Sequence, residues 1–295
     1  MSQLVLWCML LALPAAAQDR AILHERAATL RSILYEHILP FWFPQGIDRE
    51  HGGYRLNHDS ESRYLGDGDK YLVTQARITW FFSRLYRLKL GDQRHLQAAR
   101  HGYEFLRDKL WDQEFGGFYW AVDYKGKKVT MPDRHLYGQA LGLYALSEYA
   151  QAAGDVEARH LADRHFALID ERAHDGARAG YIEYFRSDWT HAPPDSTTFF
   201  YTTPSTKLMN THLHLTEALT SYYRLSNDSL ARERLIELIQ IQTNAVWRKR
   251  YGACTGGYQL DWTPLSSRWY DLVYYGHDME NVWTLIEALD AAGLP

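Results

Sequence analysis

The stretch Gly116-Gly117-Phe118-Tyr119, together with three partial copies of it, decides the fold that the sequence predicts. The copies are Gly52-Gly53-Tyr54, Gly180-Tyr181 and Gly256-Gly257-Tyr258, and their second glycines are 64, 63 and 77 residues apart. A glycine before an aromatic residue suits a loop, because glycine tolerates positive φ and the ring can close the loop against helix ends. Recurrence at such a period is typical of stacked supersecondary units.

Helical periodicity flanks every copy of the motif. The helices predicted before the loops span residues 21–39, 95–110, 158–172 and 230–247. The helices predicted after the loops span residues 71–88, 135–152, 205–225 and 277–292. One helix pair cannot bury its apolar face alone, so four pairs must stack side by side. The sequence therefore predicts an all-α toroid of helical hairpins, with short strands only inside the loops.

The amino-acid composition excludes some classes of function for this protein. The chain has 295 residues, of which 46% are hydrophobic and 23% charged, so a disordered protein is excluded. Its net charge is −4 and it has no basic block, which argues against nucleic acid as a partner. Aromatic residues make up 14% of the chain, which suits either the bulk of a helical core or the stacking of sugar rings.

The first residues are typical of a secretory leader. Residues 4–17 carry no charge and end in Ala15-Ala16-Ala17, a small-residue cleavage signal, and the run is too short to span a bilayer. We expect cleavage after Ala17, a secreted or periplasmic protein without a membrane anchor, and one domain over residues 18–295. Cleavage removes Cys8 and leaves Cys254 alone, so neither an internal disulfide nor a cysteine-based metal site is expected.

Polar residues lie in the first turns of the four helices that follow the loops. Since these helices share one direction along the chain, we expect their positive N-termini to meet, which would suit an anionic intermediate and a neutral histidine. Lys207, Asn210, His214 and Glu217 fall on one helical face, whereas His212 lies about 200° away from His214. The other three helices open with polar residues as well: Gln75 and Arg77; His135, Tyr137 and Gln139; and His277 and Glu280.

Each of these residues also has a structural interpretation. Arg77 could form a salt bridge, and His214 could be a hydrogen-bonded core histidine. His277 and Glu280 are i, i+3 neighbours that could form a cap pair. The sequence shows no third ligand for His277 and Glu280, so we expect no metal there.

At these residues the sequence resembles the N-acylglucosamine 2-epimerase superfamily, and most of all its cellobiose 2-epimerase branch. The resemblance covers residues 40–290 and rests on five segments: Gln75-Ala76-Arg77-Ile78-Thr79-Trp80, Gly116-Gly117-Phe118-Tyr119-Trp120, Leu136-Tyr137-Gly138-Gln139-Ala140, Met209-Asn210-Thr211-His212-Leu213-His214-Leu215-Thr216-Glu217-Ala218 and Tyr275-Gly276-His277-Asp278-Met279-Glu280. It implies an (α/α)6 barrel that uses neither a metal nor another cofactor.

The implied reaction is proton transfer at C2 of the reducing-end sugar of a mono- or disaccharide, after ring opening and through a cis-enediolate. His277 matches one of two catalytic histidines, and Arg77 matches the arginine that stabilises enediolate charge. Glu280 matches a carboxylate that orients or binds beside the histidine. Three further residues match sugar-contacting or ring-opening positions: Tyr137, Asn210 and His214.

The sequence ends at Pro295, after the eighth predicted helix, so the resemblance implies a barrel without its C-terminal part and without the second catalytic histidine. Within the superfamily, an aldose–ketose isomerase or an N-acylglucosamine 2-epimerase stays open. A glycoside hydrolase would need paired carboxylates, for which Asp112, Asp123 and Glu183 are candidates. A non-catalytic sugar-binding scaffold is the remaining alternative.

Overall fold

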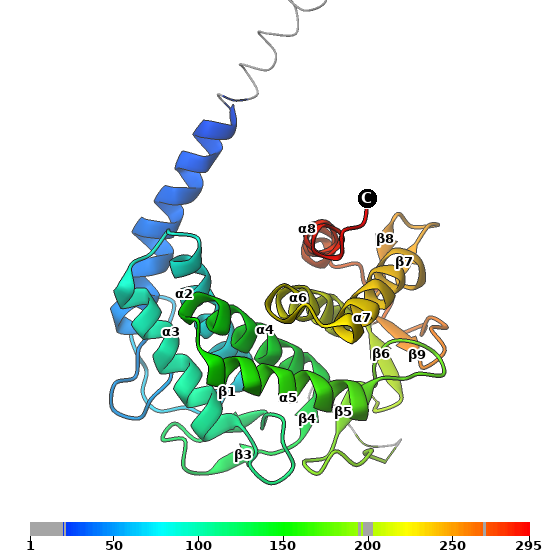
Figure 1. The fold of residues 1–295 in the computed structure, drawn as a ribbon, viewed down its shortest axis with the longest axis horizontal. Coiled ribbons are helices and arrows are strands. Elements are labelled where there is room, and N and C mark those ends of the chain that lie inside the picture. Colours follow the sequence, from blue (N-terminus) through cyan, green and yellow to red (C-terminus); the bar gives the residue numbers. More distant parts are fainter. Residues whose placement is uncertain (1–19, 21, 194–195, 197–202, 268–269) are drawn as a thin grey trace, which may run out of the picture.

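The computed structural model describes residues 20, 22–193, 196, 203–267 and 270–295. The predicted leader, residues 1–17, lies outside the described residues. The described part is mostly helical (Figure 1). Residues 22–32 form a helix that continues into η1 (Ile33–Ile38) and is followed by η2 (Phe41–Gln45).

The remaining helices form two layers. The inner helices are α2 (Leu72–Arg87), α4 (Leu136–Ala153), α6 (Met209–Ser226) and α8 (Tyr275–Ala292). The outer helices are α3 (Gln93–Phe105) with η3 (Leu106–Leu110), α5 (Val156–Ala173), and α7 (Ser229–Gln240) with η4 (Ile241–Ala245). The predicted helices are confirmed, except that α6 begins four residues later than predicted.

The inner helices pack in chain order, α2 on α4, α4 on α6 and α6 on α8. The outer helices α3, α5 and α7 pack mainly on α2, α4 and α6, respectively. The result is a curved double layer that leaves one side open (Figure 1). Packing of hairpin on hairpin therefore buries the apolar faces of α2, α4 and α6, whereas α8 leaves Met279, Val282 and Ile286 exposed.

Aspartates fix where the outer helices begin. Asp92, Asp155 and Asp228 are the N-caps of α3, α5 and α7, and each side chain accepts a hydrogen bond from a backbone N–H of the first turn. Gly154 and Asn227 end α4 and α6 in the left-handed conformation. The turn signals of the sequence thus become the connections between neighbouring inner and outer helices.

Short antiparallel strands join successive units. Three of them form one sheet: β1 (Lys70–Tyr71), β2 (Ala121–Val122) and β3 (Val129–Met131). The others form pairs: β4 (Arg134–His135) with β5 (Tyr184–Phe185), β6 (Thr206–Leu208) with β9 (Gly257–Gln259), and β7 (Trp247–Arg248) with β8 (Ala253–Cys254). The strand before each of α2, α4 and α6 pairs with the loop of the following unit, so the loops tie neighbouring hairpins together.

The fourth copy of the loop motif was placed wrongly from the sequence. Tyr54, Phe118 and Tyr181 each bridge the residue seven positions earlier, and in the fourth unit Cys254 does the same with Trp247. The structural equivalent of the first three motifs is therefore Gly252-Ala253-Cys254. Gly257 and Tyr258 instead pair with β6. The Gly-Gly-aromatic sequence recurs at a position that pairs with a different strand, which explains why the last spacing is 77 residues instead of 63 or 64.

Buried ion pairs anchor the first three loops. The aspartate before each loop meets a cation just before the following inner helix: Lys70 with Asp48, Arg134 with Asp112, and Lys207 with Asp175. Burial alone would raise the pKa of Asp48 and Asp175, but the hydrogen bonds from their lysines lower it overall. Lys207 lies in β6 and serves this anchor, so its predicted place on the site face of the helix is wrong.

The fourth residue of each inner helix holds the loop backbone. Gln75 bonds both the N–H and the C=O of Tyr54, and Gln139 does the same for Phe118. In the third unit, Nε2 of His212 accepts from the N–H of Tyr181 at 2.9 Å. These polar residues serve the loops, and the predicted divergence of His212 from His214 is confirmed.

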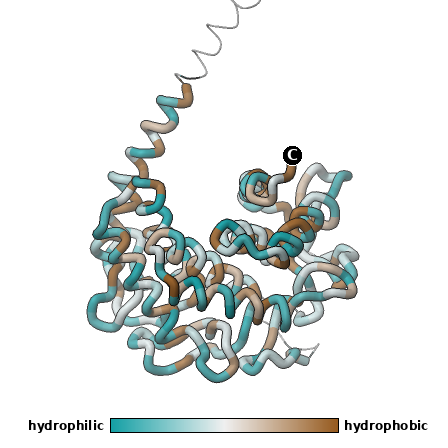
Figure 2. The backbone as a smooth tube through the Cα atoms, in the orientation of Figure 1, coloured by the Kyte–Doolittle hydropathy of each residue, from teal (hydrophilic) through white to brown (hydrophobic). Residues whose placement is uncertain are grey.

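Hydrophobic and hydrophilic residues alternate along the tube in Figure 2. Among the described residues, no helix combines the length and the apolarity that a membrane crossing requires.

Candidate active site

Side chains from three inner helices meet at the starts of those helices. Arg77 is the sixth residue of α2, and its Nη2 lies 3.3 Å from Nε2 of His214 and 3.4 Å from the hydroxyl of Tyr137. Tyr137 is the second residue of α4, and His214 is the sixth residue of α6. Since all three lie within the first two turns, the N-termini of these helices converge as predicted.

Carboxylates surround this contact. Glu217 lies one turn after His214, and its Oε2 is 2.5 Å from Nδ1 of the imidazole. Glu280, the sixth residue of α8, has a carboxylate oxygen within 4.8 Å of the ligand atoms of His214 and Glu217. Burial alone would lower the pKa of Arg77, but Tyr137, Glu217 and Glu280 raise it overall. The guanidinium therefore stays charged at the meeting point of the helices.

His277 lies in the first turn of α8 and is half-buried. Burial lowers the pKa of its imidazole, Glu280 opposes this shift, and His214 adds to it. The net shift is downward, so His277 is neutral at neutral pH and able to accept a proton. Glu280 and His214 thus act on His277 electrostatically, and direct contact of His277 with the site stays a prediction.

Asn210 lies one turn before His214 on α6 and is partly buried. Its Oδ1 is buried and makes no hydrogen bond within the described part of the chain. A buried acceptor without a partner is costly unless a ligand or water satisfies it. Its contact with a bound sugar stays a prediction.

The donor atoms of His214, Glu217 and Glu280 are close enough together to suggest a metal site. However, Nδ1 of His214 is bonded to Glu217, and its Nε2 faces the cationic guanidinium of Arg77. The arginine already places a positive charge beside the two carboxylates. The arrangement therefore suits an arginine–carboxylate cluster better than a cation site.

One turn further along the inner helices lies a layer of which sequence reasoning had singled out only Glu217. Its members are the ninth residues of their helices: Trp80, Tyr144, Glu217 and Trp283. The rings of Trp80 and Tyr144 stack with centroids 4.9 Å apart. The signal was the i+3 spacing from Arg77, His214 and Glu280, which places these residues under the site on the same face.

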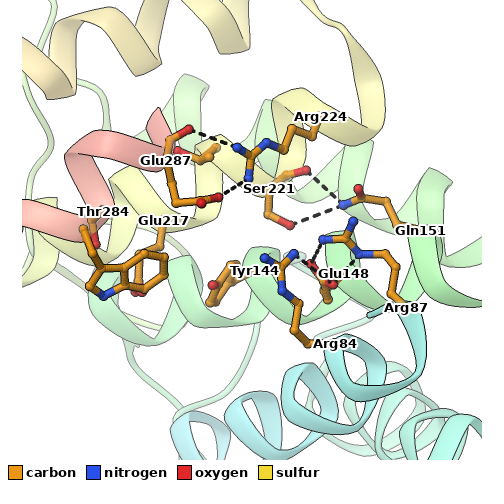
Figure 3. A pocket seen from close by; sticks show the side chains of 12 residues that line it. Arg84, Arg87, Tyr144, Glu148, Gln151, Glu217, Ser221, Arg224, Thr284 and Glu287 are labelled. Atoms are coloured by element: carbon orange, nitrogen blue, oxygen red, sulfur yellow. Dashed lines mark hydrogen bonds and ion pairs between the residues drawn. The ribbon is translucent and has the colours of Figure 1, made fainter. Parts of the chain in front are cut away.

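Beyond this layer, the four inner helices enclose a polar pocket (Figure 3). Arg87 binds Glu148 through two nitrogens, and Arg224 binds Glu287. Glu217 and Tyr144 line the pocket as well. Glu217 therefore has the site on one side and a charge-paired pocket on the other.

The carboxylates considered for a glycoside hydrolase have structural partners instead. Asp112 pairs with buried Arg134, and Asp123 accepts backbone N–H groups within its own turn. Burial raises the pKa of Glu183 to about 8, and one of its oxygens accepts from the N–H of Leu208. Asp112 and Asp123 are thus engaged in holding the loops, which argues against the hydrolase interpretation.

Comparison with known proteins shows one consistent likeness. A family model described as N-acylglucosamine 2-epimerase (GlcNAc 2-epimerase) matches residues 52–292. The chain is 33% identical to a cellobiose 2-epimerase of Bacteroides fragilis over 88% of its own length and 64% of that protein. A cellobiose 2-epimerase of Ruminococcus albus is also 33% identical, with 90% and 65% covered. The chain thus spans slightly less than two thirds of these relatives.

A solved structure supports the fold. The structure of cellobiose 2-epimerase from Bacillus thermoamylovorans superposes with a TM-score of 0.84 at 32% identity, over 92% of this chain and 68% of that one. The likeness confirms the predicted (α/α)6-barrel class for the described hairpins.

Proposed function

The chain belongs to the N-acylglucosamine 2-epimerase family, and we propose that it acts as a sugar 2-epimerase on the reducing-end aldose of a cellobiose-type disaccharide. The observation that carries this proposal is the contact of Arg77 with His214 and Tyr137 where the inner helices begin. Such a site combines a fixed cation, helix N-termini and a neutral histidine, which together suit an enediolate.

The proposed reaction starts from the open-chain sugar. The C1 carbonyl acidifies the proton on C2, and His277 removes it as a general base. Negative charge then develops on the oxygens of C1 and C2, where the guanidinium of Arg77 stabilises it. The lowered pKa of His277 supports its role, because a base must be unprotonated at the working pH.

Other residues bind and orient the sugar in this proposal. Tyr137 and Asn210 contact sugar hydroxyls, His214 contributes beside Arg77, and Glu280 orients His277. The unpartnered oxygen of Asn210 supports this assignment, since a sugar hydroxyl can donate to it. Epimerisation needs a second acid to return a proton to the opposite face of C2, a role that the resemblance gives to a second histidine and that His277 cannot fill, whereas return of the proton to C1 would give a ketose.

Product analysis tests the proposal. Incubation of the protein with cellobiose in D2O should place deuterium at C2 of the reducing-end residue, detected by NMR, whereas little of the disaccharide with mannose at its reducing end should form without a second histidine on the opposite face. A ketose product would identify the isomerase of the same family instead. Release of free glucose would contradict both, since it needs hydrolysis of the glycosidic bond.

A further inference from the structure

Glu217 has no role in the reaction proposed so far, although it touches the site directly. It is buried on α6, with its Oε2 at 2.5 Å from Nδ1 of His214. The side chain of His214 is only 2% exposed, so water does not compete freely for either ring nitrogen. His214 thus lies between a carboxylate on one side and Arg77 on the other.

The chemistry of the two neighbours fixes the protonation of the ring. A guanidinium can only donate hydrogen bonds, so Nε2 of His214, at 3.3 Å from Nη2 of Arg77, must offer its lone pair. The single proton of the neutral imidazole is then on Nδ1, where the carboxylate of Glu217 accepts it. The opposite tautomer would point an N–H at the arginine and leave the carboxylate without this donor.

We propose that Glu217 is a positioning residue that holds His214 in its Nδ1-protonated form, so that the Nε2 lone pair fixes the guanidinium of Arg77. The step from this fixed guanidinium to enediolate stabilisation rests on the proposed function. The hydrogen-bond chain from Glu217 through His214 to Arg77 does not rest on it. An orienting carboxylate behind a histidine is a common way to select one tautomer.

Nitrogen NMR of the 295-residue protein with 15N-labelled histidine tests the chain of contacts, and a His214→Gln variant assigns the His214 signals. We expect a protonated Nδ1 and an unprotonated Nε2 in the wild type. Glu217→Gln keeps an acceptor oxygen and should keep this tautomer. Glu217→Met has a similar size but no acceptor, so its Nε2-protonated fraction should rise. The kcat for proton exchange at C2 should then fall by about 10²-fold with little change in KM.

Thr216→Val is the matched control. It removes a buried hydrogen bond on the same helix, from Thr216 to the C=O of His212, and should leave the His214 tautomer unchanged. Protonation of Nε2 in the wild type would overturn the proposal, and this result needs the folded His214→Gln variant only to assign the signals. An unchanged tautomer in a folded Glu217→Met protein would also overturn it. The predicted tautomer without exchange at C2 would support the contact chain and contradict the epimerase proposal instead.

Discussion

Nζ of Lys207 lies 3.0 Å from Oδ2 of Asp175, and the two side chains are only 0% and 5% exposed. Lys207 also donates to the carbonyls of Ala179 and Leu260. The pair therefore connects the loop after α5, strand β6 and the loop after β9. It gives the third hairpin the same anchor that Lys70 and Asp48 give the first.

Asp175→Ala should destabilise the protein by about 3–5 kcal/mol, because it leaves the buried Lys207 ammonium without its counter-charge. Urea denaturation at pH 7 measures the change. Glu171→Ala is the control, since Glu171 forms only an exposed ion pair with Arg172, and it should shift the free energy of unfolding by less than about 1 kcal/mol. Equal stability of the two variants would contradict the anchoring role.

Buried histidines should make the stability depend on pH. Burial lowers the pKa of His212 to about 4 and that of His165 to about 4, against an ordinary value of 6.5. Between pH 6.5 and 4 both histidines are protonated in the unfolded chain, whereas in the native state they stay neutral. The free energy of unfolding should therefore fall as the pH falls through this window.

His212→Gln should reduce this dependence. Gln75 and Gln139 hold the equivalent loops in the first two units, so glutamine should keep the variant folded at pH 7. The variant has one fewer group that takes up a proton on unfolding. The slope of the free energy of unfolding against pH should therefore fall by up to about 1.4 kcal/mol per pH unit, measured by urea denaturation between pH 4 and 6.5. An unchanged slope would show that His212 is not held neutral.

The electrostatic interaction of His277 with Glu280 predicts how the activity should fall on the acid side of its pH profile. Since burial lowers the pKa of His277 below 6.5, the rate of C2 exchange should be flat near neutral pH and fall only below that value. Glu280 opposes the shift, so Glu280→Gln should move the midpoint of the limb to lower pH. The pH profile of kcat/KM measures both, and a midpoint that moves to higher pH in the variant would refute the electrostatic contact.

Periodicity made most of this architecture predictable. Helix positions depend on local residue patterns, so the eight predicted helical segments and the shared direction of the inner helices followed from the sequence. Helical geometry also predicted that His212 and His214 point in different directions. In the structure His212 bonds the backbone of a loop, and His214 contacts Arg77.

Pairing between distant segments was not predictable from one sequence. Lys207 fitted the helical stripe by spacing, but the pairing of Thr206–Leu208 with Gly257–Gln259 put it in a strand and turned it to Asp175. The same pairing explains why Gly256-Gly257-Tyr258 is not the fourth loop motif. The layer under the site was missed because Trp80 and Tyr144 look like ordinary core residues until their stacking is seen.

Arg77→Lys should lower kcat by about 10²–10³-fold with little effect on KM. A lysine keeps the charge but lacks the fork of donors with which Arg77 reaches both His214 and Tyr137. Steady-state kinetics with cellobiose measures the change. A rise in KM alone would instead indicate that Arg77 binds the ground-state sugar.

Export remains a prediction from the sequence. Expression with the full sequence should yield mature protein that begins at Gln18, after cleavage behind Ala17. Mass spectrometry of the secreted or periplasmic fraction measures the N-terminus. Cytoplasmic protein that still begins at Met1 would contradict the leader.

In the proposed reaction, His277 and Arg77 carry out proton transfer at C2 of a reducing sugar. Deuterium incorporation from D2O into cellobiose, followed by NMR, tests it most directly. We predict deuterium at C2 of the reducing-end residue with the wild-type protein and a rate at least 10²-fold lower with folded His277→Ala. Equal deuterium incorporation at C2 with both proteins, or none with the folded wild type, would contradict the account.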